Sequence, residues 1–417
     1  MREMKDSGVA WIGEIPKEWE ISLINTLYTV RNTKVSDVDY QPLSVTMKGI
    51  VPQLSTAAKT NAHDDRKLVK KGDFAINSRS DRRGSCGISD YDGSVSLINT
   101  VLSPRNEMNP IYYSWLFHSS EFADEFYRWG HGIVDDLWTT RWQEMRNISI
   151  PVPPLSIQHQ IAAYLDQKCT QIDALIINQQ KQIERLKAYK QSLITETVTK
   201  GLNPDVPMKD SGVEWIGEIP EDWEIVRIKN ICQFNPSSKK SFSDDDIVSY
   251  VPMECVRTGS LVHKEIAIKN VSSGLTYFEE NDIIMAKVTP CFENGNIAIA
   301  TGLTKGMAFG SSELFVFRAN ESIKFFLFYF LQNNIFKKFS ISTMTGTGGL
   351  KRVSPNFVNN YSFALPPIEE RNKIVFYLDK KCTQIDSLIA IKQRKIEKLQ
   401  QYKKSLIYEY VTGKKEI

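Results

Sequence analysis

The sequence predicts an α+β protein organised as a pseudo-two-fold tandem repeat, in which two mixed α/β modules are held apart by two long antiparallel helices paired as a coiled coil. Three observations predict this class: two segments that recur in the same order, divergent stretches between them, and two long heptad patterns free of proline and glycine. The expected segments are 1–152 (first module), 153–203 (central helix), 204–365 (second module) and 366–417 (C-terminal helix).

The repeat is visible as two pairs of matching segments. MKDSGVAWIGEIPKEWE from Met4 recurs from Met208 as MKDSGVEWIGEIPEDWE, with 14 identities in 17 positions, and PPLSIQHQIAAYLDQKCTQIDALI from Pro153 recurs from Pro366 as PPIEERNKIVFYLDKKCTQIDSLI. Such self-similarity indicates a tandem duplication. A shared frame around divergent middles favours two modules that do the same kind of task on different targets, and plain drift after duplication is the alternative.

The modules are expected to contain sheet. Short β-branched runs, such as Ile247 to Met253 and Asn296 to Ala300, alternate with Gly, Asn and Ser, which is typical of strands and loops. The step Lys71-Gly72-Asp73 of the first module becomes Glu280-Asn281-Asp282 in the second. Because glycine is lost there, we expect that loop to differ in shape between the modules.

A long helix is expected after each Pro-Pro pair, since proline favours helix entry and no Gly or Pro interrupts residues 156–200 or 369–412. Apolar residues at heptad spacing form one stripe on each helix: Leu165, Ile172, Ile176, Ile183, Leu186 and Leu193, then Leu378, Ile385, Ile389, Ile396, Leu399 and Leu406. Gln179 and Lys392 occupy matching polar positions in these stripes, which favours a role in register. Antiparallel packing would satisfy both stripes in a rod of about 60 Å.

Several protein classes are excluded by composition. The longest apolar run, from Phe325 to Leu331, is too short to span a bilayer, and no apolar signal follows the acidic N-terminus, so we expect a cytoplasmic protein without membrane contact. The six cysteines form no Cys-x-x-Cys pair and the five histidines have no metal-ligand spacing, which predicts free thiols and no metal.

Catalytic motifs are also missing. The chain has no phosphate-binding Gly-x-x-x-x-Gly-Lys loop and no Gly-x-Gly-x-x-Gly, and Asn235-Pro236-Ser237-Ser238 lacks the second proline and the aromatic residue of an amino-methyltransferase motif. The acidic run Asp244 to Asp246 is more typical of a solvated loop than of a Mg²⁺ site. We therefore expect a protein with no catalytic site and no cofactor of its own.

Basic side chains gather in module loops. Arg79, Arg82 and Arg83 follow the apolar run Phe74 to Ile76, where a strand end would project them. In the second module the loops KVTPCFENGN and TGTGGLKR combine Lys and Arg with Gly, Thr and Asn, which suit contact with phosphates and base edges. An ordinary surface loop is the alternative for each. The candidate DNA-binding residues are Lys48, Arg79, Arg82, Arg83, Arg141, Lys287, Thr289, Asn294, Thr347, Lys351 and Arg352.

The repeated segments carry a family resemblance. W-I-G-E-I-P-x-x-W at Trp11 and Trp215, the Gly-Asp-hydrophobic step at Gly72, and P-P-L/I followed by Y-L-D-x-K-C-T-Q-I-D resemble the specificity subunit of type I restriction-modification systems over nearly the whole chain. Neither copy keeps both the Glu and the Gln of the family's Pro-Pro-Leu-x-Glu-Gln pattern: Gln158 stands in the first copy, Glu370 with Arg371 in the second.

The resemblance implies a non-catalytic subunit whose two target-recognition domains each bind one half of a split, asymmetric site in double-stranded DNA. It implies two methyltransferase subunits and further restriction and translocase subunits as partners, to which S-adenosylmethionine, ATP and Mg²⁺ belong. We expect the shared frame to dock the methyltransferase subunits. The candidate docking residues are Trp11, Trp19, Tyr164, Asp166, Trp215, Trp223, Tyr377 and Asp379. For the tryptophans, packing onto the chain's own helices is the alternative.

A second interpretation is a protein-interaction scaffold in which the coiled coil presents two adaptor modules. The two differ in whether the protein, with or without a methyltransferase partner, protects a split DNA sequence with a fixed gap.

If the helices set the gap between half-sites, lengthening both should widen it. Four residues inserted between Gln182 and Leu186 and between Lys395 and Leu399 would add about 6 Å of helix, close to two base pairs at about 3.4 Å each. The insertion is slightly more than one turn, so the seam should rotate only modestly. We expect the methylated motif to keep both half-sites with a wider gap; an unchanged gap with retained activity would contradict this role of the helices.

Overall fold

The computed structural model describes residues 2–54, 63–79, 82–133, 138–238, 241–347 and 349–417. The chain forms two compact units, and each contains one module together with one end of both long helices. Unit 1 comprises Met1–Gln180 and Gln393–Ile417, and unit 2 comprises Lys181–Lys392. The helices are thus shared between the units, whereas the sequence suggested four consecutive segments.

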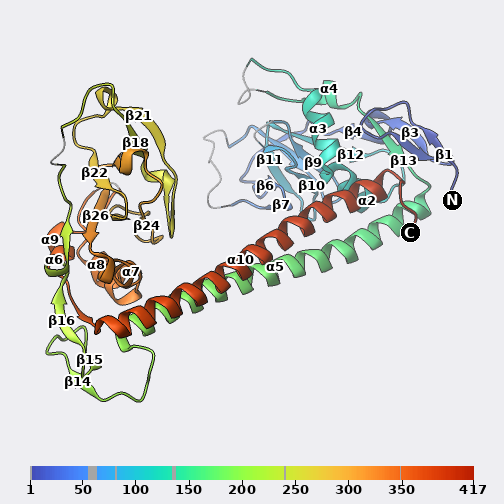
Figure 1. The fold of residues 1–417 in the computed structure, drawn as a ribbon. Coiled ribbons are helices and arrows are strands. Elements are labelled where there is room, and N and C mark those ends of the chain that lie inside the picture. Colours follow the sequence, from blue (N-terminus) through green and yellow to red (C-terminus); the bar gives the residue numbers. More distant parts are fainter. Residues whose placement is uncertain (1, 55–62, 80–81, 134–137, 239–240, 348) are drawn as a thin grey trace. The chain divides into compact units, whose positions relative to one another are not determined.

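Unit 1 is a mixed α/β module with a helix pair packed beneath it (Figure 1). Its strands are β1 (Met4–Asp6), β2 (Glu14–Pro16), β3 (Glu20–Leu23), β4 (Tyr28–Val30), β5 (Lys34–Val35), β6 (Leu43–Thr46), β7 (Gly49–Pro52), β8 (Arg66–Val69), β9 (Phe74–Asn77), β10 (Cys86–Ile88), β11 (Gly93–Ser96), β12 (Asn99–Pro104) and β13 (Ser149–Val152). Its helices are α1 (Ile24–Leu27), α2 (Pro110–His118), α3 (Ser120–Arg128), α4 (Trp142–Met145), the first part of α5 (Leu155–Lys200) and the last part of α10 (Ile368–Val411).

Unit 2 repeats this plan. Its strands are β14 (Met208–Asp210), β15 (Glu218–Pro220), β16 (Glu224–Arg227), β17 (Cys232–Phe234), β18 (Ile247–Val251), β19 (Val256–Arg257), β20 (Ser260–Leu261), β21 (Lys264–Ala267), β22 (Thr276–Glu279), β23 (Ile283–Ala286), β24 (Ile297–Ile299), β25 (Met307–Gly310), β26 (Leu314–Ala319) and β27 (Ser362–Leu365). Its helices are the last part of α5, α6 (Ile228–Ile231), α7 (Glu321–Phe330), α8 (Asn334–Ser342), α9 (Pro355–Asn360) and the first part of α10, with short 3-10 turns η3 (Met253–Cys255), η4 (Ile268–Asn270) and η5 (Thr304–Gly306).

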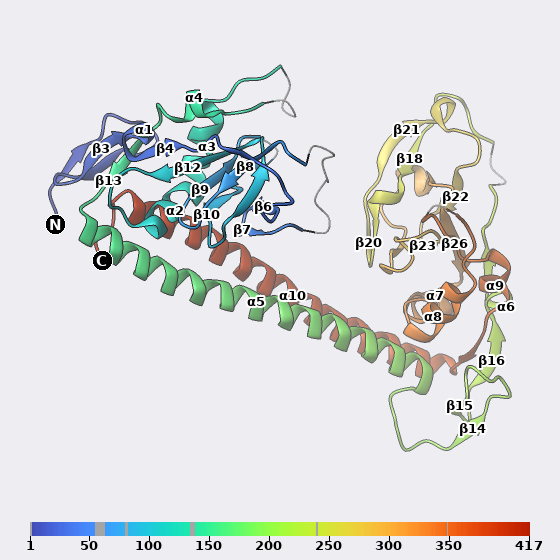
Figure 2. The same ribbon diagram turned by 180° about the vertical axis from the view of Figure 1, so that it is seen from behind.

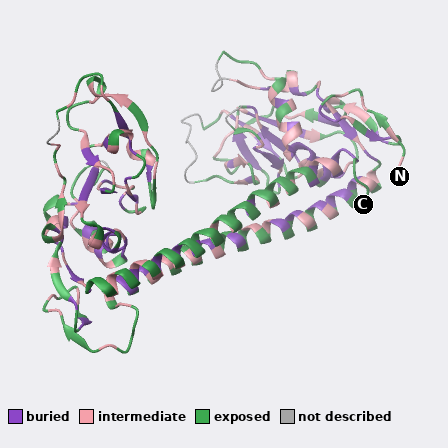
Figure 3. Ribbon diagram, viewed as in Figure 1, coloured by how far each residue is buried: buried purple, intermediate pink, exposed green. Residues whose placement is uncertain are grey.

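The same four-stranded antiparallel sheet lies at the centre of each unit. Its order is β10-β9-β12-β4 in unit 1 and β24-β23-β26-β17 in unit 2. The registers align the two sheets residue by residue, because Leu102 pairs with both Phe74 and Val30, and Phe317 pairs with both Ile283 and Phe234. Figure 3 shows that buried residues line these strands. Equivalent positions can therefore be compared directly.

The turn before β9 in unit 1 has the same shape as the turn before β23 in unit 2, so the expectation of a different loop at Asn281 is wrong. Gly72 has a φ of +87° and Asn281 one of +71°, and both N–H groups donate across the sheet, to Ser89 O (2.8 Å) and Ala300 O (2.7 Å). Asparagine tolerates this left-handed conformation better than most side chains do. The loss of glycine therefore does not change the turn.

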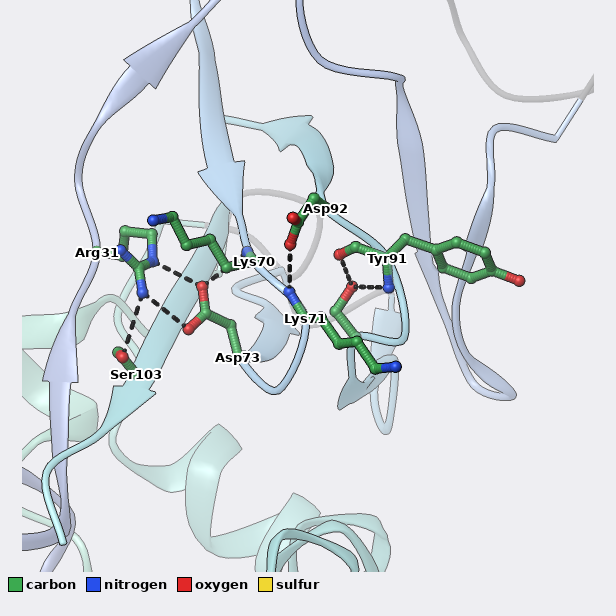
Figure 4. A network of polar contacts seen from close by, with 8 residues as sticks. Arg31, Lys70, Lys71, Asp73, Tyr91, Asp92 and Ser103 are labelled. Atoms are coloured by element: carbon green, nitrogen blue, oxygen red, sulfur yellow. Dashed lines mark hydrogen bonds and ion pairs between the residues drawn. The ribbon is translucent and has the colours of Figure 1, made fainter.

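A buried aspartate follows this turn in each unit and is neutralised by an arginine. The Asp73 carboxylate accepts from Arg31 Nε at 2.6 Å and from the Lys70 N–H at 2.9 Å (Figure 4). Asp282 accepts from Arg318 Nη2 at 2.7 Å and from the Glu279 N–H at 2.8 Å. Each carboxylate side chain is only 3% exposed, so it requires such a partner.

The two arginines come from different strands. In the aligned registers, Ser103 of β12 stands where β26 has Arg318, and Asn235 after β17 stands where Arg31 follows β4. Arg31 Nη2 also donates to the hydroxyl of Ser103 at 3.2 Å (Figure 4). The Arg31 side chain thus reaches the position that Arg318 takes in unit 2. The hydrogen bond to Asp73 raises the pKa of Arg31, and the one to Asp282 raises that of Arg318.

The long helices carry the predicted apolar stripe. Each of its twelve residues is buried or half-buried, and the polar seam residue Gln179 is buried as well. In both units α5 and α10 lie side by side in opposite views (Figures 1 and 2). The predicted start after each Pro-Pro pair is confirmed by helices that begin at Leu155 and Ile368.

Two equivalent ion pairs show that the helices run antiparallel. In unit 1, Lys403 Nζ of α10 lies 2.7 Å from the Asp173 carboxylate of α5. In unit 2, Lys190 Nζ of α5 lies 2.6 Å from the Asp386 carboxylate of α10. The repeat relates Asp173 to Asp386 and Lys190 to Lys403, so each helix offers the same acid and the same base to the other.

Each long helix ends in a left-handed glycine packed against a buried tryptophan of the repeated frame. At the end of α10, Gly413 has a φ of +70°, and a Cβ there would lie 2.5 Å from Pro16 Cδ and 3.0 Å from Trp19 Cη2. At the end of α5, a Cβ on Gly201 would lie 2.7 Å from Glu370 Oε1 and 3.4 Å from Trp223. Glycine is needed at both ends for its conformation and for its lack of a side chain.

Substitution of Gly413 tests this packing against a matched control. Gly413→Ala should lower the free energy of unfolding by about 1–2 kcal/mol for the left-handed conformation and by about 1–3 kcal/mol more for the clash with Pro16 and Trp19. Gly8→Ala should show only the first contribution, because Gly8 has a φ of +69° and nothing within 4 Å of the added Cβ. Urea unfolding followed by tryptophan fluorescence measures both; equal effects would show that the close approach does not matter.

Candidate nucleic-acid interface

Two loops that are distant in the sequence meet at the same edge of the central sheet in each unit. In unit 1 the loop after β9 joins the loop before α4 through an antiparallel bridge between Arg79 and Thr139. In unit 2 the loop after β23 joins the loop before α9 through a bridge between Val288 and Arg352. The supporting backbone bonds are also equivalent: Thr140 N to Ser78 O and Val353 N to Lys287 O, both 2.9 Å.

The structure brings most of the predicted DNA-binding residues of unit 1 to this edge. Arg79 and Arg83 are exposed on the loop after β9, and Arg141 is exposed at the start of α4. Arg82 is exposed on the same loop, of which Ser80 and Asp81 lie outside the described residues. Lys48 is exposed in the β6–β7 turn, and the adjoining Gly49 lies against β10, since a Cβ on Gly87 would be 2.7 Å from its Cα.

Arg83 is held in place by helix α3. Its Nη1 lies 3.1 Å from Asp124 Oδ1, and its guanidinium carbon lies 3.8 Å from the centre of the Tyr127 ring. Neither Asp124 nor Tyr127 was singled out from the sequence. Their spacing of three residues on an amphipathic helix was the available signal, because it places both on one face.

In unit 2 the predicted polar residues tie the two loops together. Thr289 Oγ1 donates to Gly349 O at 2.7 Å and accepts from the Lys351 N–H at 3.0 Å. Lys351, Thr347 and Asn294 are exposed, and Lys287 is half-buried with its Nζ 5.8 Å from the centre of the Phe315 ring. The residues therefore lie together, but the Thr289 hydroxyl is engaged by the chain itself.

Arg352 is also engaged. Its Nε and Nη2 form a forked contact with the Glu313 carboxylate at 2.8–3.0 Å. The hydrogen bond from Arg352 lowers the pKa of Glu313, which therefore stays ionised at neutral pH. The arginine edge best suited to bind a guanine or a phosphate is thus occupied within the domain.

A further basic residue, Arg257, was missed. It is exposed at the end of β19, where the turn to β20 contains Thr258 and Gly259. Thr258 Oγ1 donates to Gly295 O at 2.7 Å, so this hairpin lies against the loop after β23. The Arg-Thr-Gly-Ser turn between short apolar runs was the available signal.

The predicted docking residues divide into buried and exposed sets. Trp19 and Trp223 are fully buried and Trp11 is 8% exposed, whereas its equivalent Trp215 is 42% exposed. Trp223 Nε1 donates to Glu370 Oε2 at 2.9 Å. The three buried rings contact the hydrophobic cores of their own units, and Trp215 is the one tryptophan of these four with an exposed ring.

The docking residues on the helices also have contacts within their own unit. Asp166 accepts from Trp115 Nε1 at 2.7 Å, and the equivalent Asp379 accepts from the Tyr329 hydroxyl at 2.6 Å. The Tyr164 ring lies 4.6 Å from that of Tyr410, and Tyr377 is half-buried.

The one residue of the Glu-Gln pair that each copy of the Pro-Pro-Leu-x-Glu-Gln pattern keeps, Gln158 or Glu370, has a structural role. Gln158 is buried, accepts from the Asn109 N–H at 2.9 Å and donates to Pro153 O at 2.9 Å. Glu370 holds Trp223, as described above. Both therefore fix the start of a long helix to its own module.

Within the described ranges, no cluster of three or more His, Cys, Asp or Glu residues could hold a metal ion. Burial raises the pKa of the Cys169 and Cys382 thiols to about 11 and that of Cys232 to about 12, so these thiols are protonated at neutral pH. Among the helices of the described chain, none combines the length and apolar character needed to cross a membrane.

Comparison with known proteins identifies relatives of the chain. It is 32% identical over 212 residues to the type I restriction enzyme EcoAI specificity subunit of Escherichia coli, a match that covers 49% of this chain and 35% of the relative. The EcoEI specificity subunit of the same species gives 31% identity over 211 residues, again with 35% of the relative covered. The chain thus spans about a third of the length of these two relatives. The MjaVIII specificity subunit of Methanocaldococcus jannaschii is 26% identical over 96% of this chain and 93% of its own length.

Solved structures share the fold. A chain of a type I restriction-modification system matches with a TM-score of 0.72 and 13% identity, over 95% of this chain and 98% of its own. The HsdS subunit from Thermoanaerobacter tengcongensis matches with a TM-score of 0.50 and 17% identity, over 96% and 98%. The family model of the type I restriction modification DNA specificity domain matches residues 16–186 and again residues 220–401. The chain therefore belongs to this family and carries two of its DNA specificity domains.

Proposed function

We propose that the chain is the specificity subunit of a type I restriction-modification complex, in which each domain binds one half of a split sequence in double-stranded DNA. The observation that carries the proposal is the equivalent sheet edge of the two units, where the same pair of loops is joined by the same backbone bridge and carries exposed basic side chains. Family membership supports it.

Different targets for the two domains follow from the loops. The sheet beneath them is common to both units, but unit 1 offers arginines on the loop after β9, and unit 2 offers Lys351 and Arg257 while its Arg352 is bound to Glu313. Contacts to phosphates position a protein on DNA, and contacts to base edges give sequence specificity. A shared scaffold with different loop chemistry suits two domains that bind unlike half-sites.

The complex would place the chemistry in other subunits. We assign S-adenosylmethionine to methyltransferase subunits, and ATP and Mg²⁺ to restriction and translocase subunits, with the assembly acting on cytoplasmic DNA. The repeated frame would dock two copies of one partner, because equivalent surfaces can bind identical subunits. The exposed Trp215, Asp166 and Asp379 and the half-buried Tyr164 and Tyr377 are the predicted docking residues with side-chain surface available.

Removal of the loop cations should impair DNA binding. We expect alanine at all five of Arg79, Arg82, Arg83, Lys351 and Arg352 to weaken binding and to lower its salt dependence by about one unit of slope for each cation that binds a phosphate. Where one of these residues binds a base, its substitution alone should weaken the binding free energy by about 1–3 kcal/mol and relax the sequence preference at one base position. Fluorescence anisotropy across a salt series, with and without methyltransferase subunits, measures both.

A variant in which the same number of cations is removed away from the interface loops serves as the control: alanine at Lys5, Lys17 and Lys209 of the repeated frame and at Lys181 and Lys187 of α5, all of which are exposed. It should retain the DNA binding that the loop variant lacks. Intact binding of the loop variant at moderate salt would contradict the assignment of the interface.

Native mass spectrometry should find two methyltransferase subunits per chain, because the frame occurs twice. Substitution of Trp215, which is 42% exposed, by Ala should weaken one of the two sites and leave a complex with a single methyltransferase subunit. A stoichiometry of one in the unchanged protein would count against two equivalent docking surfaces.

A further inference from the structure

The first domain holds one arginine in a fixed orientation at its candidate interface. Arg83 follows β9 and contacts two residues of α3: its Nη1 lies 3.1 Å from Asp124 Oδ1, and its guanidinium carbon lies 3.8 Å from the centre of the Tyr127 ring. Asp124 and Tyr127 lie on one face of α3. The carboxylate holds one nitrogen of the guanidinium and the ring supports its plane, so the orientation of Arg83 is fixed before any ligand binds.

The aromatic support is itself fixed. The Tyr127 ring stacks on Trp138 with 5.4 Å between ring centres, and Trp138 Nε1 donates to Tyr127 O at 2.9 Å. Trp138 directly precedes Thr139, whose bridge to Arg79 joins the two loops. Arg83 therefore rests on the part of unit 1 where both loops of the interface meet.

One edge of the guanidinium stays available. Asp124 uses Nη1, and Nε and Nη2 have no hydrogen-bond partner among the residues that the structure describes. The side chain is 47% exposed, so this edge can reach a ligand. Arg352 in the second domain differs, because its Nε and Nη2 are both bound to Glu313.

The fold does not require this arrangement. Counted from the helix caps Ser119 and Asn333, the positions of Asp124 and Tyr127 are taken in α8 by Lys338 and Ile341. Unit 2 forms the same sheet, helices and loop bridge without a carboxylate or an aromatic ring there. The arrangement belongs to what distinguishes the two domains.

We infer that Arg83 recognises a guanine in the half-site bound by the first domain, with Nε and Nη2 donating to its O6 and N7. Guanine presents two acceptors side by side in the major groove, and a bidentate arginine is their commonest specific partner. Asp124 is a positioning residue, since it acts on the base through Arg83. This inference rests on the proposed function, because it identifies a base recognised by the same interface.

The methylated motif tests the inference. The full-length chain would be expressed with the methyltransferase subunits of its source in a host without adenine methylation, and modified adenines would be mapped by single-molecule sequencing. Arg83→Ala should relax one guanine position, with discrimination there falling about 10- to 100-fold, and leave every other position unchanged. Asp124→Asn should relax the same position to a smaller extent.

Arg128→Ala is the matched control, because Arg128 lies on the same helix, is exposed, and pairs with Glu125 at 3.0 Å. It should leave the motif unchanged. If Arg83→Ala abolishes methylation, the motif made by Arg83→Gln tests the inference instead. Glutamine prefers adenine, so this variant should relax or change the same guanine position of the motif. An invariant motif in the Arg83 variants overturns the inference, whereas the absence of any split motif with the unchanged chain overturns the proposed function instead.

Discussion

The buried aspartate before each central strand is the interaction on which the candidate interface depends. Asp73 and Asp282 lie at the start of β9 and β23, and the interface loops leave the other end of these strands. An ionised carboxylate so little exposed is stable only when paired and fully hydrogen-bonded. Its arginine and the backbone N–H three residues earlier meet this need, and they fix the turn, the strand register and hence the place where the loops begin.

The aspartate restricts what can vary around it. The arginine that pairs with the aspartate differs in position between the units: Arg318 lies on β26, and Arg31 follows β4. A side chain from either strand can reach the carboxylate, so the turn is the same in both units. At the far end of the strand no such requirement exists. There the loops differ in charge pairing, with Arg83 on Asp124 in unit 1 and Arg352 on Glu313 in unit 2. A constant sheet with unconstrained loops allows one fold to present different side chains in the two units.

The long helices are constrained in another way, because each end must fit a module. The acid of one helix meets the base of the other in both units, and the glycine that ends each helix packs on a buried tryptophan of the repeated frame. A change in one copy of this frame alters the packing of both helices. The repeated frame segments therefore carry the residues that fit each helix end to its module.

The sequence by itself determined the duplication, the two helices with their apolar stripes and the gathering of basic residues in module loops, because identity, heptad spacing and turn composition are local signals. Only the tertiary structure decided that the two loops of each module join at one edge, that Asn281 keeps the turn of Gly72, that Trp19 and Trp223 are buried, and which arginine neutralises each aspartate. It also showed that Arg352 is bound to Glu313 and that Asp124 and Tyr127 hold Arg83. These facts depend on strand register and on side chains about 40 or more residues apart in the chain, and no local pattern specifies which of several charged residues will come within hydrogen-bond distance.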